Sequence, residues 1–461
     1  MPVNSFENYP MSWKPIFDKS KKPLYKTLAN LLEEDILNGS LLRGAKLPPQ
    51  RELADFLDIN VSTVSKAFKV CELKGYLSAT VGSGTFVSYD KLSNTYLYSE
   101  SKLNNIVKMG ATVPENISYG PIFTQLKDMM NEGHFEKWFS YNKQEDMIWQ
   151  KDAALKLMRK GGLETSFHNV LFASGGQNAI TAILASLCKY GDKIGTDPHT
   201  YSGLKTAAAL LGIQLVPIRT ENGEMDRDAL RYTCKNENLK GIYLIPDYQN
   251  PTTHRMSISC RESISQVAKE YNVFIIEDAT NHLLSKEPLQ AIANFAPEQT
   301  IYIASLSKLI APGLRIAYIS VPNQYKNLLS DALYNFNICV SPLLSELAAR
   351  FILSKKFDNV IDDYRVNTIN RNRLVDAYLA DYNCYGDETC IFRWLQLPAN
   401  CSGVDFEDLA LEQGVQVYAA ERFTVGNSIP EKAVRLAISA PETVEELEKG
   451  LCILRKLLNS I

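Results

Sequence analysis

The sequence contains few of the features that mark secreted, membrane-spanning or metal-binding proteins. No apolar run approaches the ~18 residues that a transmembrane helix needs, and the first 22 residues lack the apolar core of a signal peptide. The nine cysteines are scattered and form no CxxC pair, which favours buried, reduced thiols over disulfides or a zinc site. These absences predict a cytoplasmic protein without a membrane partner and without a metal.

The sequence also has no large excess of positive or of negative residues. The formal net charge is −3 over 461 residues, so the whole molecule is not a polycation that coats nucleic acid. Hydrophobic residues make up 45% and charged residues 22% of the chain, which is ordinary for globular proteins and argues against disorder or a fibre. A chain of this length is sufficient for two or three domains with their own cores.

The sequence pattern divides the chain into four parts. After an N-terminal arm, residues 1–19, short helical segments and a Gly-rich hairpin occupy residues 20–88. Residues 89–117 are rich in Ser, Asn and Tyr and show no clean period, which is typical of a linker. Strand-like and helix-like segments alternate over residues 118–461. The sequence therefore predicts a small helical module, a linker and a larger domain.

The larger part reads as an α/β domain. β-Branched runs such as LKGIYLIP, YNVFIIED and TIYIAS are separated by helical segments. Buried strands that alternate with helices of about 10–15 residues predict a largely parallel sheet. In such folds, ligands bind beyond the carboxyl ends of the strands. The residues that follow these strands are therefore the candidates for a functional site.

One lysine follows a strand in the stretch SLSKLIAPGLRIAYI, residues 305–319. Lysine amines form Schiff bases with carbonyl cofactors such as pyridoxal 5'-phosphate (PLP), and PLP also needs a carboxylate beside its pyridine nitrogen. Lys308 is the candidate for the first role, and Asp278, which ends the strand VFIIED, is the candidate for the second. Each residue alone has an ordinary explanation, because most loop lysines are solvated and a strand-terminal aspartate often caps a helix.

Other strand ends supply groups for the rest of such a cofactor. Its phosphate needs a helix N-terminus, hydroxyls and an arginine, its ring needs an aromatic face, and its phenolic oxygen needs a donor. The candidates are Gly176 and Gln177 at a strand–helix junction, Ser305, Ser307 and Arg315 beside the lysine, Tyr201 for the ring and Asn250 for the phenolic oxygen. A Gly-Gly junction or an Asn-Pro pair is by itself ordinary turn chemistry. The order and spacing of the whole set favour PLP.

This part of the chain resembles fold-type I PLP enzymes, specifically the class I/II aminotransferases. The matching stretches are ASGGQNAI, DPHTYSG, PDYQNPT, FIIEDA, SLSKLIAPGLRIAYI and AVRLAIS. The resemblance implies a mixed, mainly parallel sheet with flanking helices and a smaller C-terminal α+β subdomain. It implies the roles given above, with Lys308 as the Schiff-base lysine, and it assigns Arg435 to the α-carboxylate of a ligand. The alternative for Arg435 is a surface arginine on an edge strand.

The sequence departs from that family at two places. Thr280 stands where the family has a tyrosine that also bonds the phenolic oxygen. The loss of one hydrogen bond, worth roughly 0.5–1.5 kcal/mol, should leave PLP binding intact. The stretch YNKQEDMIWQ, residues 141–150, replaces a motif that shapes the substrate entrance. Both departures affect the catalytic side, whereas the cofactor anchors remain.

The N-terminal module has the pattern of a winged helix-turn-helix. An apolar stripe from Leu24 to Ile36 predicts one helix, PPQRELADFL begins a second, and Asn60 can cap a third. The stretch GYLSATVGSGTFVS predicts a two-stranded wing. Acidic and basic residues are nearly balanced over residues 21–90, so a small packing domain without nucleic acid is the alternative. Lys46, Arg51, Lys66 and Lys69, however, gather on the proposed helix-turn-helix, whereas acidic residues cluster on the first helix.

The module closely resembles GntR-family winged helices, which are marked by L-P-x-x-R-x-L-A followed by T-V-x-x-A-[FY]. The resemblance implies binding to double-stranded operator DNA, with the third helix in the major groove. The residues expected to contact DNA are Lys46, Arg51, Ser62, Thr63, Lys66 and Gly84. Val61 stands where many relatives have an arginine that reaches a base, so we expect a different operator sequence.

Together the two parts resemble the MocR/GabR-type bacterial regulators. This resemblance implies a transcription factor whose aminotransferase-like domain binds PLP and a small amine or amino-acid effector. It also implies a homodimer, often head-to-tail, that reads paired half-sites. Two alternatives stay open: a catalytically active PLP-dependent aminotransferase with an appended DNA-binding module, and a DNA-binding protein whose second domain only dimerises. Fold alone does not separate these functions.

Overall fold

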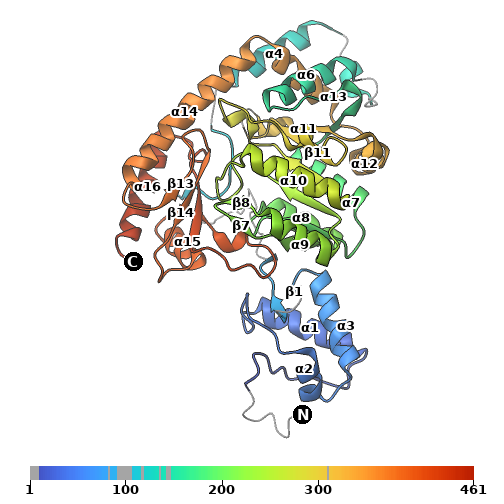
Figure 1. Ribbon diagram of the computed structural model, residues 1–461. Coiled ribbons are helices and arrows are strands. Elements are labelled where there is room, and N and C mark those ends of the chain that lie inside the picture. Colours follow the sequence, from blue (N-terminus) through green and yellow to red (C-terminus); the bar gives the residue numbers. More distant parts are fainter. Residues whose placement is uncertain are drawn as a thin grey trace.

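The computed structural model places a small N-terminal unit below a larger α/β unit (Figure 1). The predicted arm before residue 10, the Gly-Ser part of the predicted wing turn and most of the predicted linker lie outside the described residues. The structure describes residues 10–80, 84–90, 106–115, 119–133, 136–141, 147–308 and 311–461.

The N-terminal unit is a winged helix, as the sequence predicts. Its elements are α1 (Leu24–Leu37), α2 (Gln50–Leu57), α3 (Val61–Leu73), β1 (Leu77–Thr80) and β2 (Gly84–Val87). Asn60 caps α3, because its Oδ1 accepts a hydrogen bond from the backbone N–H of Ser62 at 2.8 Å. The two strands pair antiparallel. The core that joins the helices contains Leu28, Leu32, Ile36, Leu53, Leu57, Val64, Ala67, Phe68 and Cys71.

The larger unit is built on a seven-stranded sheet. Its strands are β4 (Val170–Ala173), β5 (Lys193–Thr196), β6 (Gln214–Pro217), β9 (Gly241–Leu244), β10 (Phe274–Asp278), β11 (Thr300–Ser305) and β12 (Ala317–Ser320). The strand order is β4-β12-β11-β10-β9-β5-β6. Neighbouring strands are parallel, except that β12 runs opposite to both β11 and β4. The sheet is therefore mixed and mainly parallel, as predicted.

Helices cover both faces of this sheet. They include α6 (Ile148–Lys160), α7 (Gly176–Leu187), α8 (Ser202–Leu211), α9 (Arg227–Glu237), α10 (Ile258–Tyr271), α12 (Asn323–Asn337) and α13 (Pro342–Leu353). Leu171 of β4 packs in one core with α7, α8 and α12, whereas the next residue, Phe172, packs with α6 and α13 on the opposite face. α9 and α10 pack against β9 and β10 in a third core. Burial on both faces explains the continuous apolar runs of these strands.

A long helix, α14 (Lys356–Leu379), leads into the C-terminal subdomain (Figure 1). This subdomain has a four-stranded antiparallel sheet in the order β13-β14-β17-β16. Its elements are β13 (Cys384–Tyr385), β14 (Phe392–Gln396), α15 (Gly403–Glu412), β16 (Tyr418–Ala419), β17 (Ala433–Ala437) and α16 (Val444–Leu458). Among the described residues, no helix is both long and apolar enough to cross a bilayer.

The described residues of the larger unit also form shorter elements. They are α4 (Gly120–Asn131), α5 (Glu136–Phe139), α11 (Ile292–Phe295), β7 (Thr220–Glu221), β8 (Glu224–Met225) and four 3-10 turns at Phe167–Asn169, His282–Leu284, Pro312–Leu314 and Ala420–Arg422. Of these, α4 packs against α13 at the top of the molecule in Figure 1.

Part of the predicted linker packs into the larger unit. The strand β3 (Val107–Lys108) pairs in parallel with β15 (Val415–Gln416), and Met109 is buried in the C-terminal core. The structure therefore places residues 106–115 with the larger unit, inside the range 89–117 that the sequence predicts as linker. A strand of two residues leaves no period in the sequence, which explains the difference.

The end of the winged helix is bonded to the larger unit. The backbone N–H of Tyr89 donates to the Gly426 carbonyl, and the N–H of Gly426 donates to Asp90 Oδ1, both at 3.0 Å. Lys205 in α8 is buried, and its Nζ donates to the Tyr89 carbonyl at 3.2 Å and to two carbonyls of residues 422–424 at 3.1 and 2.6 Å. Lys205 thus joins the two units through three backbone acceptors.

Candidate functional site

All nine residues that the sequence assigns to a cofactor line one cavity. The cavity has a volume of about 270 Å³ and lies where β10 and β11 end and α7 begins. Its predicted members are Gly176, Gln177, Tyr201, Asn250, Asp278, Ser305, Ser307, Lys308 and Arg315. The carboxyl ends of parallel strands meet at one edge of a sheet, which is why segments distant in sequence converge here.

Asp278 is the last residue of β10 and is held from two sides. The hydroxyl of Tyr243, in the neighbouring strand β9, donates to Asp278 Oδ2 at 2.7 Å. The hydroxyl of Thr280 donates to Asp278 Oδ1, and the Thr280 N–H lies 3.2 Å from the same oxygen. Burial, together with the Asp278 carboxylate, raises the pKa of Tyr243 well above its usual value, so Tyr243 stays a donor. These contacts fix the orientation of the carboxylate.

Lys308 lies just beyond β11 with its amine inside the cavity. Its Nζ donates to the carbonyl oxygen of Thr112 at 2.5 Å and to the Thr112 hydroxyl at 2.9 Å. Burial, reinforced by the positive charge of Arg435, lowers the pKa of Lys308 to about 8, although Asp278 opposes this shift. The amine is therefore neutral in a larger fraction of molecules near neutral pH than a solvated lysine would be.

The start of α7 forms a cradle for an anion. Gly175 has φ 93°, a conformation that favours glycine, and the Arg315 guanidinium lies next to the place where a Cβ atom would be. Arg315 Nη2 donates to the Ser174 carbonyl at 3.2 Å. Ser305 donates to Ser307 at 3.1 Å on the same wall of the cavity. The N-terminus of α7, with an arginine and two hydroxyls beside it, is suited to a phosphate.

Arg435 lies behind the cavity rather than on an edge strand. Its strand, β17, runs between β14 and β16, and the side chain is only 3% exposed, so the surface alternative is wrong. Its guanidinium donates to Asn250 Oδ1 at 2.5 Å and to the Gly110 carbonyl at 2.6 Å. The Nε atom is buried without a hydrogen-bond partner among the described residues. Burial lowers the pKa of Arg435 to about 10, which leaves it charged.

Several residues of the site were missed at the level of sequence. Thr112, Val113 and Pro114 fall in the predicted linker, where the sequence carries no period. Tyr243 does not line the cavity but supports Asp278 from β9. The hydroxyl of a tyrosine in a fully buried strand usually finds a hydrogen-bond partner, and this tendency is the signal that the sequence offered for Tyr243.

The expected DNA-contacting residues lie on the winged helix and most are open to solvent. Lys46, Arg51, Ser62, Lys66 and Gly84 are exposed, and Thr63 is half-buried. A Cβ atom at Gly84 would meet the Lys46 side chain at 2.9 Å, so the wing runs beside this lysine. The Lys66 ammonium lies 4.2 Å from the centre of the Tyr25 ring.

The chain matches two protein families. Residues 107–452 match the family described as "Aminotransferase class I and II". Residues 24–87 match the family described as "Bacterial regulatory proteins, gntR family". No group of three or more His, Cys, Asp or Glu residues within the described ranges is placed to hold a metal ion.

Relatives agree with these matches. The chain is 63% identical over 461 residues to "Uncharacterized HTH-type transcriptional regulator YdeF" of Bacillus subtilis (strain 168), covering 100% of both chains. It is 25% identical over 398 residues to "Probable rhizopine catabolism regulatory protein MocR" of Rhizobium meliloti, covering 78% of each.

The larger unit has the fold of known aminotransferases. A crystal structure of LysN, an alpha-aminoadipate aminotransferase from Thermus thermophilus, superposes with a TM-score of 0.70 at 20% identity, over 80% of this chain and 97% of that one. This likeness shows the fold alone. With the two family matches and the relatives, it confirms the resemblance to MocR/GabR-type regulators. The chain therefore belongs to the family of HTH-type transcriptional regulators in which a gntR-family DNA-binding region precedes an aminotransferase class I and II domain.

Proposed function

We propose that this regulator binds PLP in the cavity around Lys308 and changes its affinity for operator DNA in response to PLP, to an amine or amino acid, or to both. The observation that carries the proposal is the convergence of Lys308, Asp278 and Arg315 on one cavity of about 270 Å³. A transcriptional regulator that only dimerises through this unit has no need of a buried lysine beside a carboxylate and an anion cradle.

The residues present fit PLP. Asp278, oriented by Tyr243 and Thr280, supplies the carboxylate for a protonated ring nitrogen. The start of α7, together with Arg315 and the two serines, supplies donors for the phosphate. Gln177 Oε1 is buried without a hydrogen-bond partner in the described part of the chain, so the cavity contains an acceptor that the protein leaves unsatisfied.

The chain's own groups define what the site does. PLP, when bound, supplies an aldehyde that bonds reversibly to amines. Lys308 supplies a nucleophilic amine, because its lowered pKa of about 8 increases the neutral fraction. Arg435, which contacts the lining residue Asn250, is the proposed group for the carboxylate of an amino-acid effector, because its guanidinium stays charged and its Nε has no partner among the described residues. Any group that occupies the Lys308 nitrogen competes with its two hydrogen bonds to Thr112.

Coupling to DNA would run through the contacts between the two units. α8 begins directly after Tyr201, which lines the cavity, and carries Lys205 one turn later. Lys205 bonds the carbonyl of Tyr89 at the end of the winged helix. A shift of α8 on ligand binding therefore acts on the junction. Coupling of roughly 1–3 kcal/mol, which is typical, changes DNA affinity about 5–150-fold.

The proposed active form is a cytoplasmic homodimer. Symmetric dimers are the commonest assemblies of such chains and place two winged helices on paired half-sites of an operator. The dimer is expected to form through the aminotransferase-like units, in a head-to-tail arrangement. Analytical ultracentrifugation of the full chain, followed by footprinting on the operator, tests both statements.

The test of the main proposal is an operator-binding titration of the full-length protein with and without PLP, repeated with a panel of amines. The expected result is a shift in affinity that disappears in Lys308→Ala, together with the loss of the visible absorbance of covalently bound PLP. Operator affinity that ignores both PLP and amines would refute the proposal.

A second function, an active aminotransferase with an appended DNA module, is favoured by one observation. Lys308 has a pKa lowered to about 8 by burial and by the charge of Arg435, and an amine that is partly neutral near neutral pH can transfer protons. Steady-state turnover decides between the two. Rates of about 1–1000 per second with an amino-acid/keto-acid pair indicate an enzyme, and a single half-reaction indicates a sensor.

A further inference from the structure

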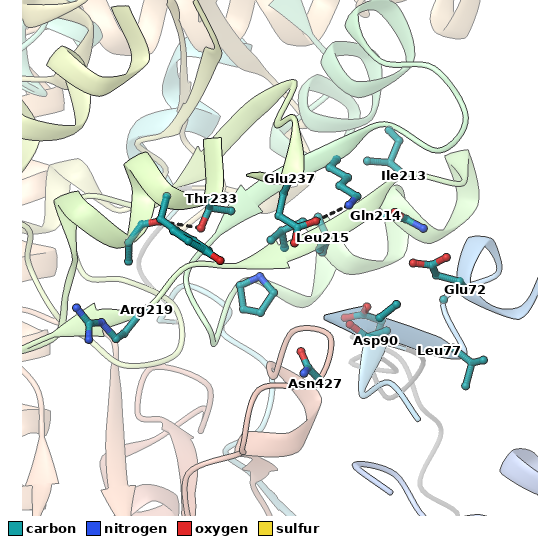
Figure 2. Close-up of a pocket in the computed structure, with 18 of the residues that line it drawn as sticks. Glu72, Leu77, Asp90, Ile213, Gln214, Leu215, Arg219, Thr233, Glu237 and Asn427 are labelled. Carbon is teal, nitrogen blue, oxygen red and sulfur yellow. Dashed lines mark hydrogen bonds and ion pairs between the residues drawn. The ribbon is translucent and has the colours of Figure 1, made fainter. Parts of the chain in front are cut away.

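A second cavity, of about 470 Å³, lies at the seam between the winged helix and the larger unit. The winged helix contributes one side of it through Glu72, Leu77 and neighbouring residues of β1, together with Asp90 just beyond β2. The larger unit contributes the other side through β6, the edge strand of the sheet, and through α9. Figure 2 shows side chains from both units around the same space. None of the residues assigned above to PLP or DNA lines it.

The walls of this seam cavity combine an apolar surface with polar and charged side chains. The side chains that supply this surface are Leu77, Ala79, Ile213, Leu215, Val216, Pro217, Ala229 and Tyr232. An apolar surface of this kind can bind the hydrocarbon or aromatic part of a small molecule. Gln214 adds a polar feature, because its Nε2 is buried and has no hydrogen-bond partner in the part of the chain that is described.

The charges around the cavity are unequal. Four carboxylates line it, from Glu72, Asp90, Asp228 and Glu237, against two basic side chains. Both basic side chains are already neutralised: Lys193 pairs with Glu237 at 2.5 Å, and Arg219 pairs with Asp226 at 2.7 Å.

Two of the carboxylates, Asp90 and Asp228, form no ion pair among the described residues, although the Asp90 charge acts on the buried Lys205 ammonium and opposes the lowering of its pKa by burial. Glu72 pairs with Lys69 at 2.9 Å. Asp90 uses one oxygen to accept from the N–H of Gly426 at 3.0 Å. The second oxygen of Asp90 and the whole Asp228 carboxylate give the seam a negative potential.

From this combination we infer that the seam cavity binds a small organic cation with an apolar body, such as an alkyl- or arylammonium ion. Its cationic head lies toward Asp90 and Asp228, and its apolar body lies on β6 and Tyr232. The site is separate from the Lys308 cavity. Because the walls come from both units, an occupant binds one relative arrangement of the winged helix in preference to others and thereby shifts that equilibrium.

The probe for this inference is benzyltrimethylammonium, which has no N–H and cannot form an imine with PLP. Isothermal titration of the full-length protein should show saturable binding. Neopentylbenzene, its uncharged carbon isostere, should bind more weakly, because it has the same shape without the charge. Amide hydrogen exchange should slow in the peptides that contain β1 and β6 when the cation binds.

Charge-matched variants locate the site. Asp90→Asn/Asp228→Asn should weaken binding of the cation roughly tenfold, because it removes the two lining carboxylates that have no ion pair among the described residues. The amide oxygen introduced at position 90 can still accept from the N–H of Gly426, so the junction is retained. The control, Asp331→Asn/Asp363→Asn, removes two exposed carboxylates on α12 and α14 that do not line the cavity, and it should bind the cation like the wild type. Lys308→Ala should also bind it unchanged.

Three results would overturn the inference. The first is equal affinity of the cation and its uncharged isostere. The second is equal affinity of the seam variant and its charge-matched control. The third is loss of cation binding in Lys308→Ala, which would place the probe in the cofactor cavity. Failure of PLP to affect DNA binding would leave these readouts unchanged, so the two proposals are tested independently.

Discussion

The amine of Lys308 is bonded to the backbone and the side chain of Thr112, at 2.5 Å to its carbonyl oxygen and at 2.9 Å to its hydroxyl. Thr112 belongs to residues 106–115, a segment of the predicted linker between the winged helix and the larger unit. The nucleophile of the proposed PLP site is therefore in direct contact with the chain that leads from the DNA-binding unit. A ligand bonded to the Lys308 nitrogen would replace its hydrogen bonds to Thr112 and thereby affect the position of residues 106–115.

Substitution of Thr112 should alter the reactivity of Lys308. Thr112→Val removes the hydroxyl that accepts from the ammonium and thereby favours the neutral amine. A hydrogen bond to a charged group is worth about 1.5–3 kcal/mol, and loss of part of it should lower the pKa of Lys308 by about one unit. Covalent capture of PLP at neutral pH should become up to about tenfold faster in stopped-flow absorbance. Thr112→Ser retains the hydroxyl and should behave like the wild type; equal rates for all three proteins would contradict the assignment.

Capture of PLP by the full-length protein should depend on pH through Lys308. Only the neutral amine attacks an aldehyde, and the pKa of Lys308 is lowered to about 8. The capture rate should rise about tenfold per pH unit below pH 8 and level off above it. A profile that continues to rise toward the usual lysine pKa of 10.5 would show that the amine is not desolvated.

The carboxylate of Asp278 should dominate PLP affinity. Asp278→Asn removes the charge that pairs with a protonated ring nitrogen, and we expect about 10–100-fold weaker binding of PLP in equilibrium dialysis. Tyr243→Phe removes only the donor at 2.7 Å from Asp278 Oδ2 and should weaken binding by a few fold. Asp331→Asn, an exposed carboxylate on α12, is the control for loss of charge. An Asp278→Asn protein that binds PLP normally would remove this residue from the site.

Lys205 should be needed to transmit the ligand signal to the winged helix. Lys205→Met retains the buried stem but removes the donors to the carbonyls of Tyr89 and of residues 422–424. The change in operator affinity that PLP causes should become at least about fivefold smaller in this variant. PLP itself should bind as it does to the wild type. Lys235→Met, an exposed lysine of α9, controls for loss of a positive charge. A full response in Lys205→Met would exclude this junction as the coupling path.

Arg51 should contribute to DNA affinity mainly through charge. It is exposed at the start of α2, where a phosphate contact suits an arginine. Arg51→Ala should weaken operator binding at low salt and reduce the slope of log affinity against log salt by about 0.9. Lys26→Ala, an exposed lysine on α1 outside the expected contact face, should leave the slope unchanged. Fluorescence anisotropy over a salt series measures both.

The sequence by itself determined the two architectures and most of the cofactor candidates. Apolar runs separated by helical segments predicted the parallel-rich sheet, because a sheet buried on both faces needs continuous apolar strands. Eight of the nine cofactor candidates lie at or near a strand end or a helix start, which local sequence patterns indicate well, and Asn250 lies in the loop between β9 and α10. Asn60 was recognisable as a cap for the same reason: its bond to Ser62 spans two residues.

Only the tertiary structure decided which distant segments meet. Thr112 and Lys308 are separated by 196 positions, and Asn250 and Arg435 by 185. Neither pair leaves a periodic signal, because their contact depends on how β3 and β17 pack against the larger unit. The same holds for Lys205 and Tyr89, 116 positions apart, and for the seam cavity between the units. Local patterns report the backbone conformation of a segment, whereas the partner of a buried side chain is set by packing in three dimensions.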